Sequence, residues 1–193
     1  MYALFISTFD KEINIGLLKN GMVVEEMKKE SMRNHSMYVM TMIENILKSN
    51  DINASFLNEI IVVNGPGSFT GVRIGVTIAK TLAYTLDIPI KTITSLEAFA
   101  VSVDSDKNKL SVISDLKGKY VGYFSYDNKL IEDYKYLKNN DYEEFIKDKE
   151  EYLIDNTNFD LVKIYNYLKN TESINPHLVN PIYIKGIDAL NGK

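Results

Sequence analysis

The chain has 193 residues, a formal net charge of −4 and no cysteine. This length accommodates one large domain or two small lobes. The absence of cysteine excludes disulfides, thiolate nucleophiles and cysteine zinc sites, and is typical of a reducing compartment. The chain has only two histidines, which are not one helical turn apart, so we predict no metal site.

Charge and hydropathy limit the possible partners. Lysines alternate with acidic residues instead of forming a basic stripe, which argues against independent binding of nucleic acid. No apolar run approaches the roughly 20 residues of a membrane span, and residues 1–10 have the pattern of a strand rather than of a signal peptide. We therefore predict a cytoplasmic protein without membrane contact that reaches RNA through a partner.

The first part of the chain alternates between apolar and polar residues with the period of β-strands. This pattern predicts strands over 2–7, 12–19 and 22–27. Asn20-Gly21 between the last two strands is a two-residue hairpin signal, because both residues tolerate a positive φ.

A helix is predicted over 36–48, where the apolar period changes to that of an α-helix. Its regular apolar face comprises Val39, Ile43, Ile46 and Leu47. Further apolar side chains surround the helix: Met37, Tyr38, Met40 and Met42. Two interpretations remain, a helix that is buried on all sides or a helix that offers methionines to a partner's groove.

A βαβ crossover is predicted next. The β-branched run 60–63 indicates a buried strand and leads through a glycine-rich loop, Gly65 to Gly71, into a helix that ends near Leu86. A further strand follows over 90–94, and Ser95 is suited to cap the helix after it.

The polar stretch 104–109 predicts a linker between an N-terminal lobe, 1–104, and a smaller C-terminal lobe, 105–193. In the second lobe, strands are predicted over 110–113, 120–126 and 129–137, and short helices over 142–146 and 161–168.

The glycine-rich loop resembles a phosphate-binding loop, because glycines let backbone N–H groups approach an anion. However, Val72-Arg73 follows Gly71 where a Walker loop has lysine and serine or threonine. A nucleophilic serine at Ser68 lacks the flanking glycines of a hydrolase elbow. We therefore predict a structural loop in which Ser68 or Thr70 caps the helix, and no catalytic residue.

The helix after this loop carries a stripe of small residues at every fourth position: Gly71, Gly75, Ala79 and Ala83. Such a stripe allows another backbone to come close. An interior glycine costs a helix about 1 kcal/mol relative to alanine, so close packing is expected to offset that cost. The spacing is compatible with a neighbour inside the chain and with one in another subunit.

The loop and helix closely resemble the signature of the TsaB (YeaZ) family. The matching motif is Gly65-Pro66-Gly67-Ser68-Phe69-Thr70-Gly71-Val72-Arg73-Ile74-Gly75. The match continues through Ile88-Pro89 and Ser95-Leu96-Glu97-Ala98, and the upstream His35-Ser36 and the final Pro181-Ile182-Tyr183-Ile184-Lys185 are also similar to the family. The resemblance covers roughly residues 1–100 and is thin afterwards.

The resemblance implies an α/β, actin-like (Hsp70-like ATPase superfamily) fold of two ribonuclease-H-like lobes, of which the second is reduced. It further implies a non-catalytic subunit that binds the catalytic protein TsaD, with the ATPase TsaE, to place threonylcarbamoyl on adenosine 37 of tRNA. Homodimers occur in the family. The residues expected to contact the partner are His35, Tyr38, Met42, Asn45, Gly71, Gly75 and Ala79.

Two alternatives involve nucleotide. A stand-alone ATPase would need Asp10 and Asp115 to hold magnesium, because Ser7 occupies the position of the catalytic aspartate of actin-like ATPases. No cofactor is expected to bind tightly, but the N–H groups of Gly65 to Gly71 leave open ATP or ADP at an interface with TsaD. A protease, the older glycoprotease description of related proteins, lacks the necessary side chains.

Overall fold

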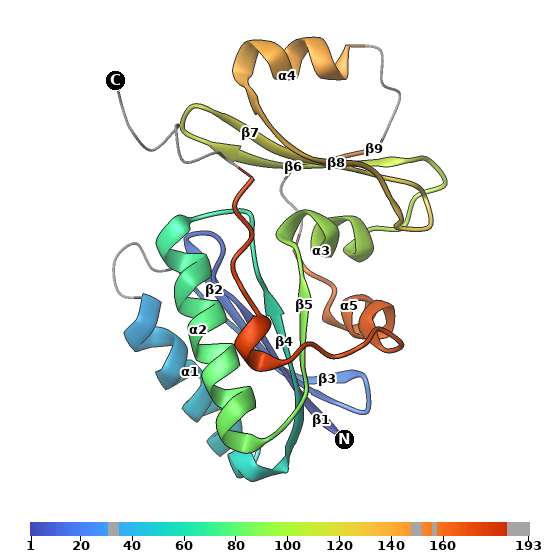
Figure 1. Ribbon diagram of the computed structural model, residues 1–193. Coiled ribbons are helices and arrows are strands. Elements are labelled where there is room, and N and C mark those ends of the chain that lie inside the picture. Colours follow the sequence, from blue (N-terminus) through green and yellow to red (C-terminus); the bar gives the residue numbers. More distant parts are fainter. Residues whose placement is uncertain (31–34, 148–151, 156–157, 185–193) are drawn as a thin grey trace. The chain divides into compact units, whose positions relative to one another are not determined.

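The computed structural model describes residues 1–30, 35–147, 152–155 and 158–184 (Figure 1). The chain forms two compact units, one of Met1–Ser95 and Leu161–Pro181 and one of Leu96–Asp160 and Ile182–Lys193. The prediction had placed a single division at residue 104. In the described part of the chain, no helix is both long enough and apolar enough to cross a membrane.

The first unit contains a five-stranded sheet in the order β3-β2-β1-β4-β5. Its strands are β1 (Tyr2–Ser7), β2 (Glu12–Lys19), β3 (Met22–Glu30), β4 (Leu57–Val63) and β5 (Ile90–Ile93). β1 pairs antiparallel with β2 and parallel with β4. Asn20 and Gly21 have φ values of 53° and 82°, which confirms the predicted hairpin turn.

Helices cover both faces of this sheet. Figure 1 shows α1 (His35–Ser49) and α2 (Phe69–Leu86) on one face and α5 (Leu161–Leu168) on the other.

The predicted apolar face of α1 is buried, but Met37 and Met40 are 58% and 46% exposed. The interpretation of α1 as a helix buried on all sides is therefore wrong, because only one side faces the sheet. The 3-10 helices η1 (Ala54–Phe56) and η2 (Pro176–Leu178) complete the unit.

A buried lysine holds α5 against the sheet. The Lys91 ammonium donates to the carbonyls of Leu168 (2.8 Å) and Lys169 (3.2 Å) at the end of α5. The same ammonium lies 3.5 Å from the buried carboxylate of Glu59 on the adjacent strand. These contacts join the chain after residue 160 to the sheet of the first unit.

The second unit contains a four-stranded sheet in the order β8-β7-β6-β9. Its elements are α3 (Ser95–Ser102), β6 (Lys109–Asp115), β7 (Gly118–Phe124), β8 (Leu130–Lys138), α4 (Asn139–Ile146) and β9 (Tyr152–Ile154). On one face, Tyr142 of α4 packs on Leu110 and Val121. On the other, Leu96 and Ala100 of α3 pack on Phe124. β9 was not predicted.

Candidate functional site

The glycine-rich loop of the first unit closes onto the turn between β1 and β2. The Ser68 N–H donates to the carbonyl of Phe9 at 2.6 Å. A Cβ at Gly67 would lie 2.3 Å from that carbonyl oxygen, so only glycine permits this contact. From the other side, the Ser95 hydroxyl donates to the carbonyl of Pro66. The glycine-rich loop therefore packs closely against the chain's own β1–β2 turn.

Helix α2 begins at the end of the glycine-rich loop with Ser68 as its N-cap, as predicted. The Ser68 Oγ accepts from the N–H of Gly71 at 3.3 Å. The N–H groups of Ser68 and Gly71 thus have partners within the protein. A phosphate bound by this loop would have to compete with the Phe9 carbonyl and the Ser68 hydroxyl for these two donors.

The stripe of small residues faces inward. A Cβ at Gly71 would lie 2.1 Å from the carbonyl oxygen of Thr8, and one at Gly75 would lie 2.2 Å from the Thr8 Oγ1. The Thr8 hydroxyl donates to the Gly71 carbonyl at 2.7 Å, and Ala79 is fully buried. The backbone that comes close is the chain's own, which corrects the placement of Gly71, Gly75 and Ala79 on a partner-facing surface.

The four partner-facing residues predicted on α1 lie in different environments. Met42 is 4% exposed and belongs to the core, because it lies on the helix face that packs against the sheet. Its placement at a partner surface is therefore also corrected. Tyr38 is half-buried beneath the Lys29 ammonium, 3.8 Å from the ring centroid, whereas Asn45 is exposed. The side chain of His35 lies outside the described part of the structure.

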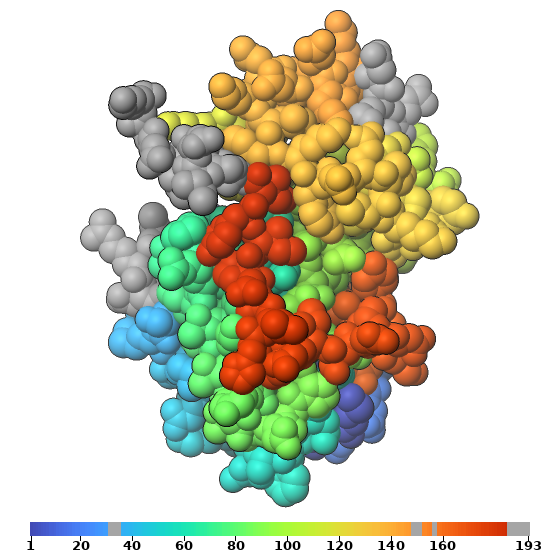
Figure 2. Space-filling view, viewed as in Figure 1, coloured from blue at the N-terminus to red at the C-terminus, as the bar shows by residue number. Residues whose placement is uncertain are grey.

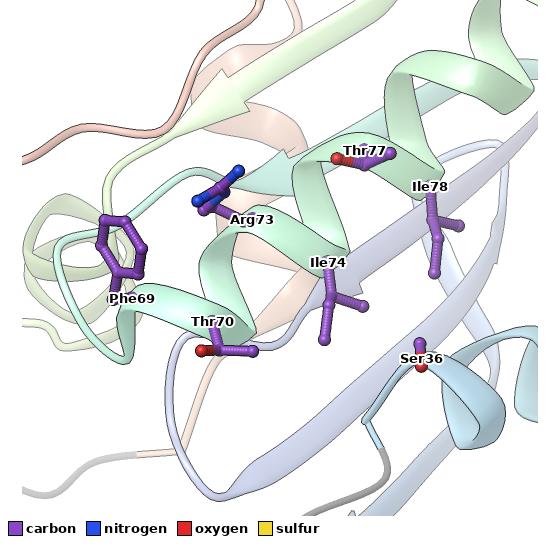
Figure 3. Close-up of a pocket in the computed structure, with 7 residues that line it drawn as sticks. All are labelled: Ser36, Phe69, Thr70, Arg73, Ile74, Thr77 and Ile78. Atoms are coloured by element: carbon purple, nitrogen blue, oxygen red, sulfur yellow. The ribbon is translucent and has the colours of Figure 1, made fainter.

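A shallow groove of about 330 Å³ lies between the start of α1 and the outer side of α2 (Figure 3). It is lined by Ser36, Phe69, Thr70, Arg73, Ile74, Thr77 and Ile78. Figure 3 shows Ile74 and Ile78 on the flank of α2 that faces Ser36. Sequence reasoning missed Ser36, Ile74, Thr77 and Ile78 as site residues, although the spacing of positions 70, 74 and 78 places them on one helix face.

Of the described residues that line the groove, Arg73 alone is charged. The only charged residues of α2 are Arg73 and Lys80. Lys80 is occupied elsewhere, since its ammonium donates to the carbonyls of His177 (3.3 Å) and Val179 (3.0 Å). Figure 2 shows this C-terminal segment, in red, against the green surface of α2. Arg73 lies over the ring of Phe69, with its Cζ 5.2 Å from the centroid.

The outer side of α1 carries one internally neutralised charge pair. The Lys48 ammonium donates to the Glu44 carboxylate at 2.6 Å. This hydrogen bond, together with the charge of Lys48, lowers the pKa of Glu44 below its ordinary value. Lys48 and Glu44 therefore each have a counterion on the same helix, and neither needs one from a partner.

The two acidic residues that an ATPase site would require, Asp10 and Asp115, make hydrogen bonds within the protein. Ser7 is buried. The exposed Asp10 accepts from the N–H of Lys11 at 2.7 Å, and Asp115 accepts from the hydroxyl of Tyr136 at 3.0 Å. Among the described residues, no three histidine, aspartate or glutamate side chains gather in a group able to hold a metal ion.

Comparisons with known proteins identify relatives of the chain. A family model described as TsaD, tRNA N6-adenosine threonylcarbamoyltransferase, matches residues 23–139, more than half of the chain. A Bacillus subtilis protein named tRNA threonylcarbamoyladenosine biosynthesis protein TsaB is 40% identical over 68% of this chain and 58% of its own length. The Escherichia coli protein of the same name is 31% identical over 52% of this chain and 43% of its own. The chain thus spans about half the length of these curated relatives.

A solved structure supports the same assignment at the level of the fold. YeaZ from Pseudomonas aeruginosa superposes with a TM-score of 0.79 at 18% identity, over 94% of this chain and all of the other. This similarity confirms the expected α/β fold, and the second unit has the smaller sheet. The glycine-rich motif, the relatives named TsaB and the YeaZ structure agree, and the chain belongs to the TsaB (YeaZ) family.

Proposed function

We propose that the protein is a non-catalytic subunit of the cytoplasmic machinery that makes N6-threonylcarbamoyladenosine at position 37 of tRNA. In this role it binds the catalytic subunit TsaD, reaches tRNA and TsaE only through that complex, and performs no chemistry itself. The names of its relatives supply the pathway. The groove between α1 and α2 supplies the binding surface.

The single observation that carries the proposal is the character of the outer side of α2. Ile74 and Ile78 are half-exposed, and the threonines at 70, 77 and 81 are exposed beside them. A surface helix normally places charged residues on its solvent side. A long helix whose outer side carries a single charged residue, Arg73, is suited to pack against another helix.

The absence of chemistry is supported by the turn that fills the glycine-rich loop. Phe9 and Thr8 take up the space that an anion would need. Two of the N–H donors are engaged as well, that of Ser68 by the Phe9 carbonyl and that of Gly71 by the Ser68 hydroxyl. We therefore expect neither magnesium-dependent ATP hydrolysis nor tight nucleotide binding by the isolated chain. ATP or ADP bound only in the presence of TsaD would place the nucleotide at the interface between the two proteins.

The test is to mix the purified chain with TsaD of the same organism and to measure mass by light scattering, with each protein alone as a reference. We expect a heterodimer, and we expect Ile78→Glu to weaken it at least about tenfold by placing a carboxylate in the groove. Val23→Glu is the matched control, because Val23 is 40% exposed on β3, outside the groove. A chain that forms only homodimers in every mixture would contradict the proposal.

A further inference from the structure

Among the described residues that line the groove, Arg73 carries the one charged side chain. This guanidinium has no carboxylate within salt-bridge distance among the described residues. Its one described interaction is with the ring of Phe69, one turn earlier on α2. A cation–π contact of this kind restricts the position of the guanidinium without using its N–H donors in a hydrogen bond.

A guanidinium held in this way is suited to a planar anion. Arginine binds carboxylates through two parallel hydrogen bonds, which fixes the relative orientation of the two groups. When a partner helix covers the groove, Arg73 loses part of its hydration. A covered charge without a counterion is costly, so a stable complex requires an acidic group opposite Arg73.

A second copy of this chain is poorly suited to supply that group from the described residues of α1 and α2. In a two-fold symmetric dimer each copy presents the same patch. On α2 the charges are Arg73 and Lys80, both positive. On α1, within residues 36–49, the carboxylate is that of Glu44, which already pairs with Lys48. Among the described residues of these two helices, self-association therefore covers two copies of Arg73 and offers only a carboxylate that already pairs with Lys48.

We propose that Arg73 is the specificity-determining residue of this surface, and that its guanidinium pairs with a carboxylate on the partner helix. This pairing favours a heterologous acidic partner over a second copy of the chain, since like charges that meet at an interface are selected against. The inference rests on the proposed function, because it assigns the partner's chemistry at the same groove.

The experiment compares wild type with Arg73→Gln, Arg73→Lys and Arg73→Glu in calorimetric titrations with TsaD, and follows self-association of each variant by sedimentation. Arg73 is exposed, so circular dichroism is expected to show an unchanged fold. Lys19→Glu is the control, because it makes the same charge change as Arg73→Glu. Lys19 is exposed and lies at the end of β2 that is far from the glycine-rich loop.

We expect Arg73→Gln to weaken binding to TsaD about tenfold and Arg73→Glu about a hundredfold or more, with Arg73→Lys between wild type and Arg73→Gln. Lys19→Glu should stay within about twofold of wild type, and Arg73→Gln should self-associate at least as strongly as wild type. Restoration of Arg73→Glu binding by a single acidic-to-lysine change on TsaD would identify the carboxylate.

Three results would overturn the inference. If wild type binds TsaD and all Arg73 variants bind equally well, the inference fails while the proposed function stands. If ATP strengthens the wild-type complex but not the Arg73→Gln complex, the anion is a phosphate rather than a carboxylate. If wild type does not bind TsaD at all, the proposed function fails and the inference fails with it.

Discussion

Substitution of Gly75 by alanine tests whether the small-residue stripe packs inside the chain. The new Cβ would lie 2.2 Å from the Thr8 Oγ1, far closer than real contacts allow, while the Thr8 Cβ and Cγ2 would lie at 3.4 and 3.5 Å. The Thr8 hydroxyl must therefore move. It is fully buried and donates to the Gly71 carbonyl, and this hydrogen bond would be lost.

The expected magnitude follows from three opposing contributions. Alanine gains about 1 kcal/mol over glycine in a helix interior. An unpaired buried hydroxyl costs about 1–3 kcal/mol, and overpacking of the site costs a further 1–3 kcal/mol, roughly. We expect Gly75→Ala to lower the free energy of unfolding of the first unit by about 2 kcal/mol. In a Thr8→Ala background the obstructing oxygen is absent, so the same substitution should be neutral or stabilise by up to about 1 kcal/mol.

The assay is urea denaturation of the four proteins of this double-mutant cycle, followed by circular dichroism at 222 nm because the chain has no tryptophan. A coupling free energy of about 2–3 kcal/mol between positions 8 and 75 is expected. The reasoning is refuted if Gly75→Ala is stabilising on its own, or if the two substitutions are additive. A folded Gly75→Ala protein that only loses TsaD binding would instead place this stripe at the partner interface.

Two further substitutions test contacts that hold the first unit together. Ser68→Ala should cost about 1 kcal/mol of stability by removing the α2 cap, whereas Ser68→Asp, which retains a capping oxygen, should stay close to wild type in thermal denaturation. Lys91→Met should cost about 3–5 kcal/mol because it leaves the buried Glu59 carboxylate without its ammonium. The double variant Lys91→Met with Glu59→Gln should recover part of that loss in urea denaturation, and failure to recover any would contradict the role given to the ion pair.

Local sequence patterns were sufficient to predict most of the secondary structure. Strands β1 and β2 were predicted at their observed bounds. The Asn20-Gly21 turn marks the end of β2 and the start of β3, because both of its residues tolerate a positive φ. Helix α5 was likewise predicted at its observed bounds. The strand β9 was missed because three residues carry too little periodicity to be distinguished from a loop.

The division into units depends on long-range contacts that spacing does not encode. The segment after residue 160 joins the first unit, where α5 buries Leu161, Ile164 and Leu168 and the Lys91 ammonium binds the helix end 77 residues away. In the sequence, Lys91 is a polar residue within a predicted strand. Its burial, and the buried acidic partner on the neighbouring strand, become visible only when β4 and β5 are paired.

The candidate site shows the same limit within a single helix. Glycine and alanine at every fourth position identify a side of α2 that approaches a backbone, but they do not identify whose backbone it is. The Thr8 carbonyl and hydroxyl settle that point, since both lie within 2.2 Å of where a side chain would begin. Once that side is assigned to the turn, the opposite side, with Arg73 and its uncharged neighbours, is the part of α2 left for a partner. The motif that identifies the family thus has two sides. Its glycines pack against the β1–β2 turn, and its arginine lies on the outer surface of α2.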